Sequence, residues 1–270
     1  MTNDDRPHPS TAATPTDQPP ALSLVIPAYE EAARLPETFR AVEAWLEAPP
    51  RSPVEVLLVD DGSRDATLPL CQELAARHPG RVRAIGAAHR GKAATVTRGI
   101  LEAEGALVLF SDADLSTPLA DTVKLIRAIE SGADVAIGSR EIPGARRDAE
   151  PGYRHLLGRG FNRMVQLALL PGIQDSQCGF KMFTREAARA IFGRLRRYGP
   201  DAPVIQGPMV TAFDVEVLFL ARKLGFVVEE VPVAWTHATG SKVRPVVDAL
   251  RMARDVARVK WGDLRGEYRA

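Results

Sequence analysis

Two groups of aspartates stand directly after apolar runs of the sequence. Asp60 and Asp61 follow the run at 54–59, and Asp112 and Asp114 follow another. In an extended or sharply turning segment, the side chains of Asp112 and Asp114 point the same way and can share one hard cation, Mg²⁺ or Mn²⁺. Such an ion neutralises the negative charge that develops on a departing diphosphate. The spacing therefore predicts metal-assisted group transfer.

The same aspartates have simpler explanations. Asp112 and Asp114 could form a solvated turn or cap a helix, and short matches of this kind are usually incidental. Asp60 could help to satisfy the free amides of the next helix, where Ser63 and Asp65 also stand. Their positions favour the functional interpretation, because open α/β sheets place their ligands at the ends of strands.

The elements that must position these aspartates alternate between strand and helix. Short apolar runs are followed by stretches in which apolar residues recur at helical spacing. Runs that are apolar on both faces are typical of buried parallel strands. We therefore expect an α/β fold with a mostly parallel central sheet and helices on both faces. The first expected strands are residues 22–26, 54–59, 82–85, 106–110 and 133–138.

The pattern loosens after residue 140, where prolines and glycines predict a loop. That loop carries three arginines, Arg140, Arg146 and Arg147. Further along the chain we expect a helix from about 155 to 170, a strand near 181–183, helices from 185 and over 213–224, a strand at 227–231 and a basic amphipathic helix at 246–259.

Composition restricts the class of protein. The 35 Lys and Arg residues balance 34 Asp and Glu residues, which gives no general reason to expect a nucleic-acid partner. Cys71 and Cys178 lack the spacing of a zinc site or disulfide scaffold, so a reducing cytoplasm is the simpler expectation. We expect residues 1–20 to be a disordered tail, 21–262 one domain and 263–270 a second tail. No run approaches the roughly 18 apolar residues of a membrane span, and no signal peptide is evident.

Several motifs follow one another in a family-specific order. They are VIPAYEE at 25–31, the two aspartate groups with Gly91-Lys92 between them, DSQCGFK at 175–181, and Trp235 followed by GSK at 240–242. With this order, the chain resembles family 2 glycosyltransferases of the GT-A fold. Within that family it is similar to the dolichyl-phosphate β-glucosyltransferases and dolichyl-phosphate mannose synthases. The resemblance extends from Leu22 to about Trp261.

The resemblance implies an inverting hexosyltransferase that binds a nucleotide sugar, requires Mg²⁺ or Mn²⁺ and serves protein glycosylation. It implies that Asp112 and Asp114 hold the metal and that Asp114 takes part in catalysis. His237 is an additional candidate ligand, although it could be merely structural, and Ser116 stands where mannose synthases place a glutamine ligand. The implied donor-binding residues are Pro27, Tyr29, Glu31, Asp60, Asp61, Lys92, Asp112, Ser241 and Lys242.

The acceptor is open between a polyprenyl phosphate and a soluble or protein hydroxyl. A phosphate monoester is already an anion near neutral pH, with a second pKa of about 6, and needs no strong base. We assign the binding of this phosphate to Lys181 and to Arg140, Arg146 or Arg147, and we count Lys181 also as a candidate catalytic residue. The three arginines could instead form a solvated basic loop. A hydroxyl acceptor would need a base, for which Asp214 or Glu216 is the candidate, unless these carboxylates only complement a helix dipole.

For the donor, UDP-glucose is favoured over GDP-mannose because the GSK and Gln177-Cys178 segments look closer to the glucosyltransferases. The membrane span of eukaryotic relatives has no counterpart, so any membrane contact would be peripheral, at the inner face of the cell membrane. The apolar stripe of 155–170, flanked by Arg159 and Arg163, could serve such contact or pack in the core. For the C-terminal helix we expect packing on the domain.

Two other classes of protein share part of this pattern. A phosphoacceptor receiver module also carries an acidic pair and a later aspartate, but the lysine it needs after the next strand is replaced by Ser139-Arg140. A nucleotidyltransferase would carry a glycine-rich basic loop after its first strand, whereas residues 27–31 are acidic and lack glycine. A receiver module would also not need the motifs beyond residue 170.

Overall fold

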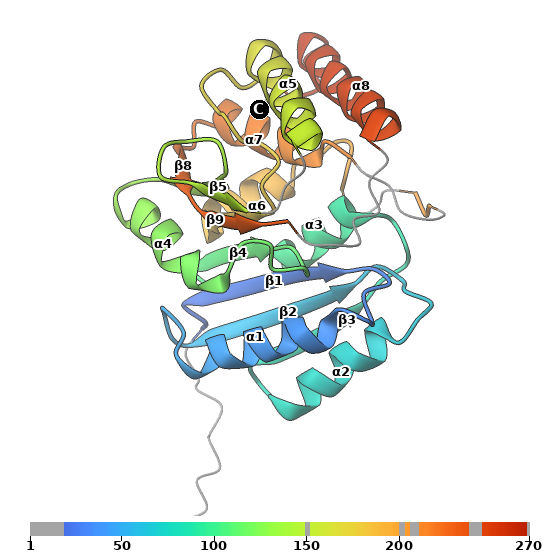
Figure 1. Cartoon of the computed structure of the whole chain (residues 1–270), viewed down its shortest axis with the longest axis vertical. Coiled ribbons are helices and arrows are strands. Elements are labelled where there is room, and N and C mark those ends of the chain that lie inside the picture. The colour runs from blue at the N-terminus through green and yellow to red at the C-terminus, as the bar shows by residue number, and fades with distance from the viewer. Residues whose placement is uncertain (1–18, 149–151, 200–202, 206–210, 238–244, 269–270) are drawn as a thin grey trace, which may run out of the picture.

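A seven-stranded sheet runs through the centre of this computed structural model, which describes residues 19–148, 152–199, 203–205, 211–237 and 245–268 (Figure 1). The strand order is β3-β2-β1-β4-β7-β5-β8. The strands are β1 (Leu22–Ala28), β2 (Val54–Asp60), β3 (Val82–Gly86), β4 (Leu107–Ser111), β5 (Val135–Ser139), β7 (Phe180–Thr184) and β8 (Val228–Pro232). The expected α/β fold with a mostly parallel sheet is confirmed.

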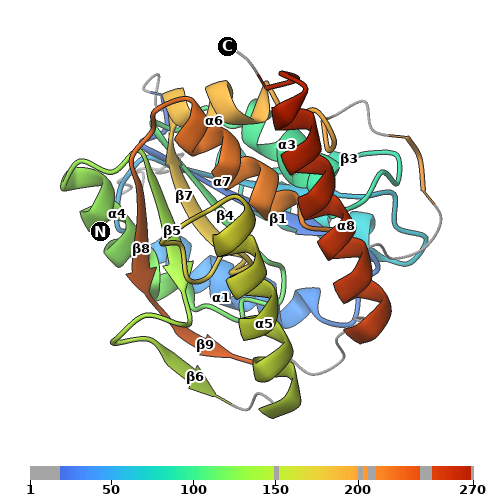
Figure 2. The ribbon, with the colours of Figure 1, turned by 90° about the horizontal axis from the view of Figure 1, so that it is seen from above.

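Helices cover both faces of this sheet, as Figures 1 and 2 show. On one face, α1 (Leu35–Glu47), α2 (Thr67–Arg77) and α4 (Thr122–Glu130), which follows the short 3₁₀ turn η1 (Leu119–Asp121), bury one apolar core. On the other face, a second core involves α3 (Lys92–Glu102), α5 (Gly152–Ala168), α6 (Arg185–Phe192), α7 (Phe213–Lys223) and α8 (Pro245–Leu264). Alternate residues of each strand pack in the two cores, because neighbouring side chains point to opposite faces of the sheet.

The strand order reverses beside β1, and this reversal indicates where a ligand would bind at the edge of the sheet. The chain proceeds outward from β1 through β2 to β3, and then returns to the other side of β1 with β4. A crevice forms outside the carboxyl ends of strands at such a reversal. Asp112 follows the end of β4, and Tyr29 follows the end of β1, so both stand at this crevice.

Strand β7 lies antiparallel between β4 and β5, although the local pattern did not indicate its direction. Phe110 of β4 and Ile137 of β5 are both in register with Lys181 of β7. Residues 140–152, expected to form only a loop, also contain β6 (Arg146–Asp148), which pairs in parallel with β9 (Ala234–Thr236). Strands of three residues are too short to show a period in the sequence.

The C-terminal segment packs on the domain further than expected. Helix α8 continues to Leu264, and the Tyr268 side chain is buried, where its hydroxyl donates a hydrogen bond to Glu216. Residues 263–268 therefore belong to the packed structure, whereas the sequence suggested a tail from residue 263. None of the helices in the described part of the chain has the length and apolarity needed to cross a membrane.

Candidate active site

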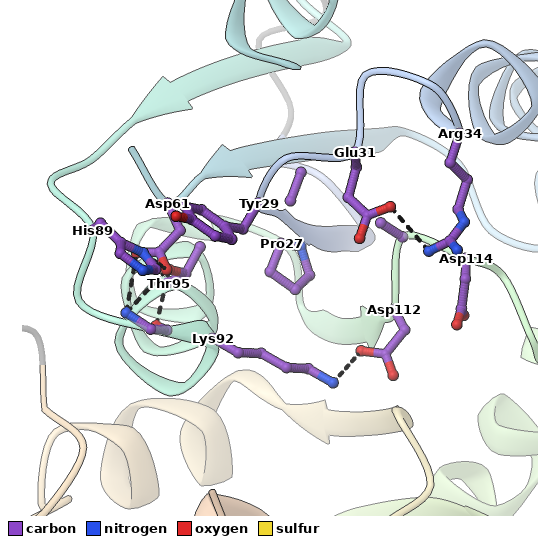
Figure 3. A pocket seen from close by; sticks show the side chains of 13 residues that line it. Pro27, Tyr29, Glu31, Arg34, Asp61, His89, Lys92, Thr95, Asp112 and Asp114 are labelled. Atoms are coloured by element: carbon purple, nitrogen blue, oxygen red, sulfur yellow. Dashed lines mark hydrogen bonds and ion pairs between the residues drawn. The ribbon is translucent and has the colours of Figure 1, made fainter. Parts of the chain in front are cut away.

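One pocket of about 240 Å³ lies at the carboxyl ends of β1, β2 and β4 (Figure 3). The pocket brings together residues that the sequence singled out from four separate segments: Pro27, Tyr29, Glu31, Asp61, Lys92, Asp112 and Asp114. Three lining side chains were not foreseen, namely Arg34, His89 and Thr95. The nearness of His89 to the Gly91-Lys92 motif was the available signal for that residue, and Arg34 offered none.

The loop that carries Asp112 and Asp114 is held by its own backbone. The amide of Asp112 donates to the carbonyl of Gly179 at 3.1 Å, and the amide of Leu115 donates to the carbonyl of Asp112 at 3.1 Å. Leu115 adopts a φ of 45°, which a non-glycine residue rarely adopts. Oδ1 of Asp114 accepts a hydrogen bond from the Ser116 amide at 3.0 Å. This sharp turn aims both aspartates at the pocket.

Because Gly179 has no side chain, the Asp112 carboxylate can pack directly against it. A Cβ built on Gly179 would overlap the carboxylate group of Asp112. The glycine of the DSQCGFK segment is therefore required by close packing against the aspartate, which the sequence alone could not reveal.

Lys92 is the cationic partner of Asp112. Its Nζ lies 2.5 Å from Oδ1 of Asp112, and the two side chains are 43% and 32% exposed. Burial lowers the pKa of Lys92, but the carboxylates of Asp112 and Asp214 outweigh it, so the pKa ends above its ordinary value. Burial, together with Asp114, raises the pKa of the Asp112 carboxyl in spite of Lys92. Negative charge is thus crowded at this end of the pocket.

The donor atoms of this crowded end fit Mg²⁺ or Mn²⁺. Two carboxylates offer the hard oxygen ligands that these ions prefer, and Mg²⁺ commonly uses one or two carboxylates together with substrate phosphates. Within the described residues, no cluster of three or more His, Cys, Asp or Glu side chains is placed to hold an ion. The arrangement therefore suits a metal that binds along with a diphosphate, rather than a cage built entirely of protein.

The opposite end of the pocket is aromatic. The rings of Tyr29 and His89 are stacked with centroids 4.0 Å apart and planes 4° from parallel. Nδ1 of His89 lies 2.7 Å from Oδ2 of Asp61, and Asp61 also accepts hydrogen bonds from the Arg90 and Gly91 amides at 2.8 and 2.9 Å. A flat nucleobase could stack on this pair while its polar edge meets the surrounding groups.

Of the adjacent residues Asp60 and Asp61, which the sequence treated as one acidic pair, only Asp61 lines the pocket. Oδ2 of Asp60 accepts a hydrogen bond from the Ser63 amide at 3.1 Å, as helix or turn capping would predict. Asp60 is not among the pocket-lining residues, and its Oδ1 is buried without a hydrogen-bond partner. Adjacent residues at a strand end face opposite sides of the sheet, so only Asp61 lines the pocket.

Lys181 and Asp214, both candidates for catalysis, form a buried ion pair. Nζ of Lys181 lies 2.6 Å from Oδ1 of Asp214, and Lys181 is 1% exposed. Lys181 projects from the middle of the sheet, and Asp214 lies in the first turn of α7. Each of these buried charges is neutralised by the other, so Lys181 makes a structural contact. Its contact with an acceptor phosphate stays a prediction.

Glu216, the alternative base, lies deeper in the same region. Its Oε1 accepts hydrogen bonds from the Arg196 amide at 2.9 Å and the Tyr268 hydroxyl at 2.8 Å. Burial raises the pKa of its carboxyl, although the Arg196 amide opposes that shift. The contacts of Glu216 tie the chain near 196 and the C-terminal segment to α7.

Of the three arginines assigned to the acceptor, two make ion pairs within the chain and the third is exposed to solvent. Arg140 makes a two-point ion pair with Asp175 at 2.7 and 2.8 Å, and lies over the Trp235 ring. Burial alone would raise the pKa of Asp175, but Arg140 holds it at about 2. Arg147 lies 2.7 Å from Glu141 and also over Trp235, whereas Arg146 is exposed.

A groove of about 780 Å³ lies beside these arginines. Its lining combines Arg140 and the loop 141–145 with Arg159 and Arg163 of α5. Three arginines, Arg140, Arg159 and Arg163, thus line the groove together with one carboxylate, that of Glu141. This excess of basic side chains favours an anionic ligand.

Strand β9, which precedes the candidate ligand His237, lies beside the aspartate loop. The Thr236 amide donates to the Ser116 carbonyl at 2.9 Å, which brings β9 alongside that loop. His237 follows, but it does not join Asp112 and Asp114 in a ligand cluster, so its metal role stays a prediction. Ser241 and Lys242 lie outside the described residues.

Comparisons with known proteins give one consistent result. The sequence pattern of "Glycosyl transferase family 2" matches residues 23–192. The chain is 36% identical to a dolichyl-phosphate beta-glucosyltransferase of Drosophila melanogaster, over 92% of this chain and 77% of that protein. It is 34% identical to the protein of the same name from Homo sapiens, over 97% and 80% of the two chains.

Solved structures support the fold. Mannosyl-3-phosphoglycerate synthase from Rubrobacter xylanophilus superposes with a TM-score of 0.63 at 20% identity, covering 93% of this chain and 76% of that one. Glucosyl-3-phosphoglycerate synthase from Mycobacterium tuberculosis, solved with Mn²⁺, UDP-glucose and phosphoglyceric acid, gives 0.61 at 15% identity, covering 92% and 80%.

Proposed function

This chain belongs to glycosyl transferase family 2, and from that premise we propose that it transfers glucose from UDP-glucose to a polyprenyl phosphate. A phosphate oxygen of the acceptor attacks the anomeric carbon, the bond from that carbon to the UDP oxygen breaks, and UDP departs. The configuration at the anomeric carbon inverts. The relatives named dolichyl-phosphate beta-glucosyltransferase support both the sugar and the class of acceptor.

The observation that carries this proposal is the pocket in which Asp112, Asp114 and Lys92 meet Tyr29, His89 and Asp61. A nucleotide sugar requires an aromatic or polar subsite for its base and a charged subsite for its diphosphate. Tyr29 and His89 offer the first, and Asp112 and Asp114 offer the second with a bound cation. The two subsites lie at opposite ends of one pocket, as Figure 3 shows. Mg²⁺ or Mn²⁺, held by Asp112 and Asp114, would supply charge neutralisation for the leaving diphosphate.

The arginine groove supports a phosphate acceptor. Arg140 is positioned by Asp175 and Trp235, and Arg159 and Arg163 face the groove from α5. An acceptor phosphate is already ionised at neutral pH, so the enzyme needs cations more than a base. The pairing of Asp214 with Lys181 agrees with this requirement, because Oδ1 of Asp214 is already engaged by the lysine.

A donor and acceptor panel tests the proposal. Purified protein is incubated with UDP-glucose or GDP-mannose, with and without polyprenyl phosphate, in Mn²⁺ or Mg²⁺, and nucleoside diphosphate and labelled lipid are measured. We expect UDP release that requires the lipid phosphate and yields labelled glucosyl lipid. Transfer from GDP-mannose alone would overturn the donor assignment. Release of UDP with phosphoglyceric acid or another soluble acceptor, but not with the lipid, would overturn the acceptor.

We propose further that the protein is cytoplasmic and binds the inner face of the cell membrane peripherally through α8. One face of α8 packs in the core through Val256 and Val259. The outer face exposes Leu250, Trp261 and Leu264, which are 69%, 57% and 68% exposed. Exposed basic residues accompany them: Arg251, Arg254, Arg258, Lys260 and Arg265. Each basic residue near an anionic leaflet contributes about 1 kcal/mol.

Flotation with liposomes that contain anionic lipid tests this surface. We expect the protein to float at low salt, and to float much less at 1 M salt because screening weakens the arginines' attraction. The double variant Trp261→Ser, Leu264→Ser should lose binding, whereas Val227→Ser, at a residue that is 55% exposed elsewhere, should retain it. Equal flotation of all three proteins, or none at low salt, would remove the membrane role of α8.

A further inference from the structure

Lys92 is fixed in place at the start of α3. It follows Gly91, whose φ of 92° and ψ of 160° are accessible almost only to glycine. The carboxylate of Asp61 anchors this turn by accepting hydrogen bonds from the Arg90 and Gly91 amides. The Lys92 side chain then extends over the Phe110 ring, with Nζ 5.5 Å from the ring centroid, toward Asp112.

Asp112 is held at one carboxylate oxygen and packed closely at the other. Oδ1 lies 2.5 Å from Nζ of Lys92, and Oδ2 lies in the space that the absent Cβ of Gly179 leaves. Asp114 also has one oxygen engaged, because its Oδ1 accepts from the Ser116 amide. The two carboxylates that suit a divalent cation are therefore already bound to partners within the chain.

In this arrangement, the ammonium of Lys92 and a divalent cation would compete for the Asp112 carboxylate. A divalent cation at Asp112 would lie close to the ammonium of Lys92, and like charges at such a distance repel strongly in a partly buried site. A nucleoside diphosphate changes the balance in two ways. Its phosphate oxygens give Lys92 a new anionic partner, and they supply the oxygen ligands that two aspartates alone do not provide.

We propose that Lys92 occupies Asp112 in the nucleotide-free protein and releases it only to a diphosphate, so that the divalent cation and the nucleotide bind as a coupled pair. This inference rests on the proposed function, because it takes the pocket to bind a nucleoside diphosphate. Lys92 is then a positioning residue that changes partners, from Asp112 to the donor phosphates. The coupling prevents the aspartates from collecting a metal ion before the donor arrives.

Mn²⁺ titration tests the proposal without any turnover. The electron paramagnetic resonance signal of free Mn²⁺ measures binding to wild type and to Lys92→Met, with and without UDP. We expect Lys92→Met to bind Mn²⁺ at least about tenfold more tightly than wild type when UDP is absent, because the repelling ammonium is gone. In wild type, saturating UDP should raise Mn²⁺ affinity by a similar factor, and Mn²⁺ should raise UDP affinity equally. In Lys92→Met this coupling should shrink.

Two further variants control the measurement. Lys124→Met removes a comparable lysine, which lies 2.9 Å from Asp121 and outside the pocket, and should leave Mn²⁺ binding unchanged. Adding Asp112→Asn to Lys92→Met should abolish the gained Mn²⁺ affinity, which locates the gain at Asp112. Thermal melting of each variant confirms that it is folded.

The outcomes separate this inference from the proposed function. Equal Mn²⁺ affinities of wild type and Lys92→Met without nucleotide would overturn the role of Lys92, even if UDP-glucose proves to be the donor. If neither UDP nor UDP-glucose binds any folded variant, the proposed donor is wrong. The nucleotide-free comparison then still decides whether Lys92 opposes cation binding at Asp112.

Discussion

Replacing Asp114 with asparagine is expected to lower the rate of glucosyl transfer about 1,000-fold or more, with little effect on stability. A metal that neutralises a leaving diphosphate supplies several kcal/mol, and each 1.36 kcal/mol is about a factor of ten in rate. The Asp114 side chain is half-buried at the pocket and is not among the core residues, so its replacement should not unfold the protein. Steady-state assay of lipid glucosylation with saturating Mn²⁺, alongside thermal melting, measures both quantities.

Two other variants sharpen this test. Asp263→Asn removes a carboxylate that pairs with Lys223 on the far helices, and should leave the rate unchanged. Gly179→Ala keeps both aspartates but inserts a Cβ into the space of the Asp112 carboxylate, so it should also reduce transfer strongly. If Asp114→Asn retains more than about a tenth of wild-type activity, charge neutralisation by this residue is not what drives the reaction.

Replacing Lys181 with methionine is expected to destabilise the protein by about 3–5 kcal/mol. The variant leaves the Asp214 carboxylate buried without its partner, 6% exposed beside the second core. Breaking a buried pair costs this much because the remaining charge has lost both water and its counter-ion. Such a loss is a large part of the 5–15 kcal/mol by which folded domains are stable, and urea unfolding would measure it.

The companion variants distinguish a structural lysine from a catalytic one. Lys181→Met combined with Asp214→Leu removes both charges of this pair and should recover much of the lost stability. Arg51→Gln breaks the exposed pair with Glu130 and should cost no more than about 1 kcal/mol. If Lys181→Met keeps wild-type stability but loses transfer, the lysine acts on the acceptor phosphate, as the sequence suggested.

Much of the donor pocket was predictable because its parts are local motifs. Each motif follows the end of a strand or begins a helix: the turn after β1, Gly91-Lys92, and Asp112 with Asp114. Because parallel strands end at one edge of a sheet, these motifs meet there. The strands themselves were evident because buried parallel strands are apolar throughout. The relation of these motifs to family 2 glycosyltransferases followed from their order along the chain.

Other features depend on pairing between distant segments, which no local pattern encodes. The antiparallel insertion of β7 places Lys181 against Asp214 as a buried ion pair, a contact that the sequence did not indicate. Arg140 is held by a two-point pair with Asp175, 35 residues away, which no local pattern indicates. The opposite orientations of Asp60 and Asp61 could have been foreseen, since adjacent residues at a strand end alternate in direction.

The sequence by itself determined which groups this protein brings to its chemistry: two carboxylates for a cation, a lysine, an aromatic turn and a set of arginines. Only the tertiary structure decided which of these groups face the pocket and which neutralise one another. The physical reason is that residue type and spacing fix local geometry and charge, whereas the partner of a charged side chain depends on strand order, direction and close contacts such as that of Gly179 with Asp112.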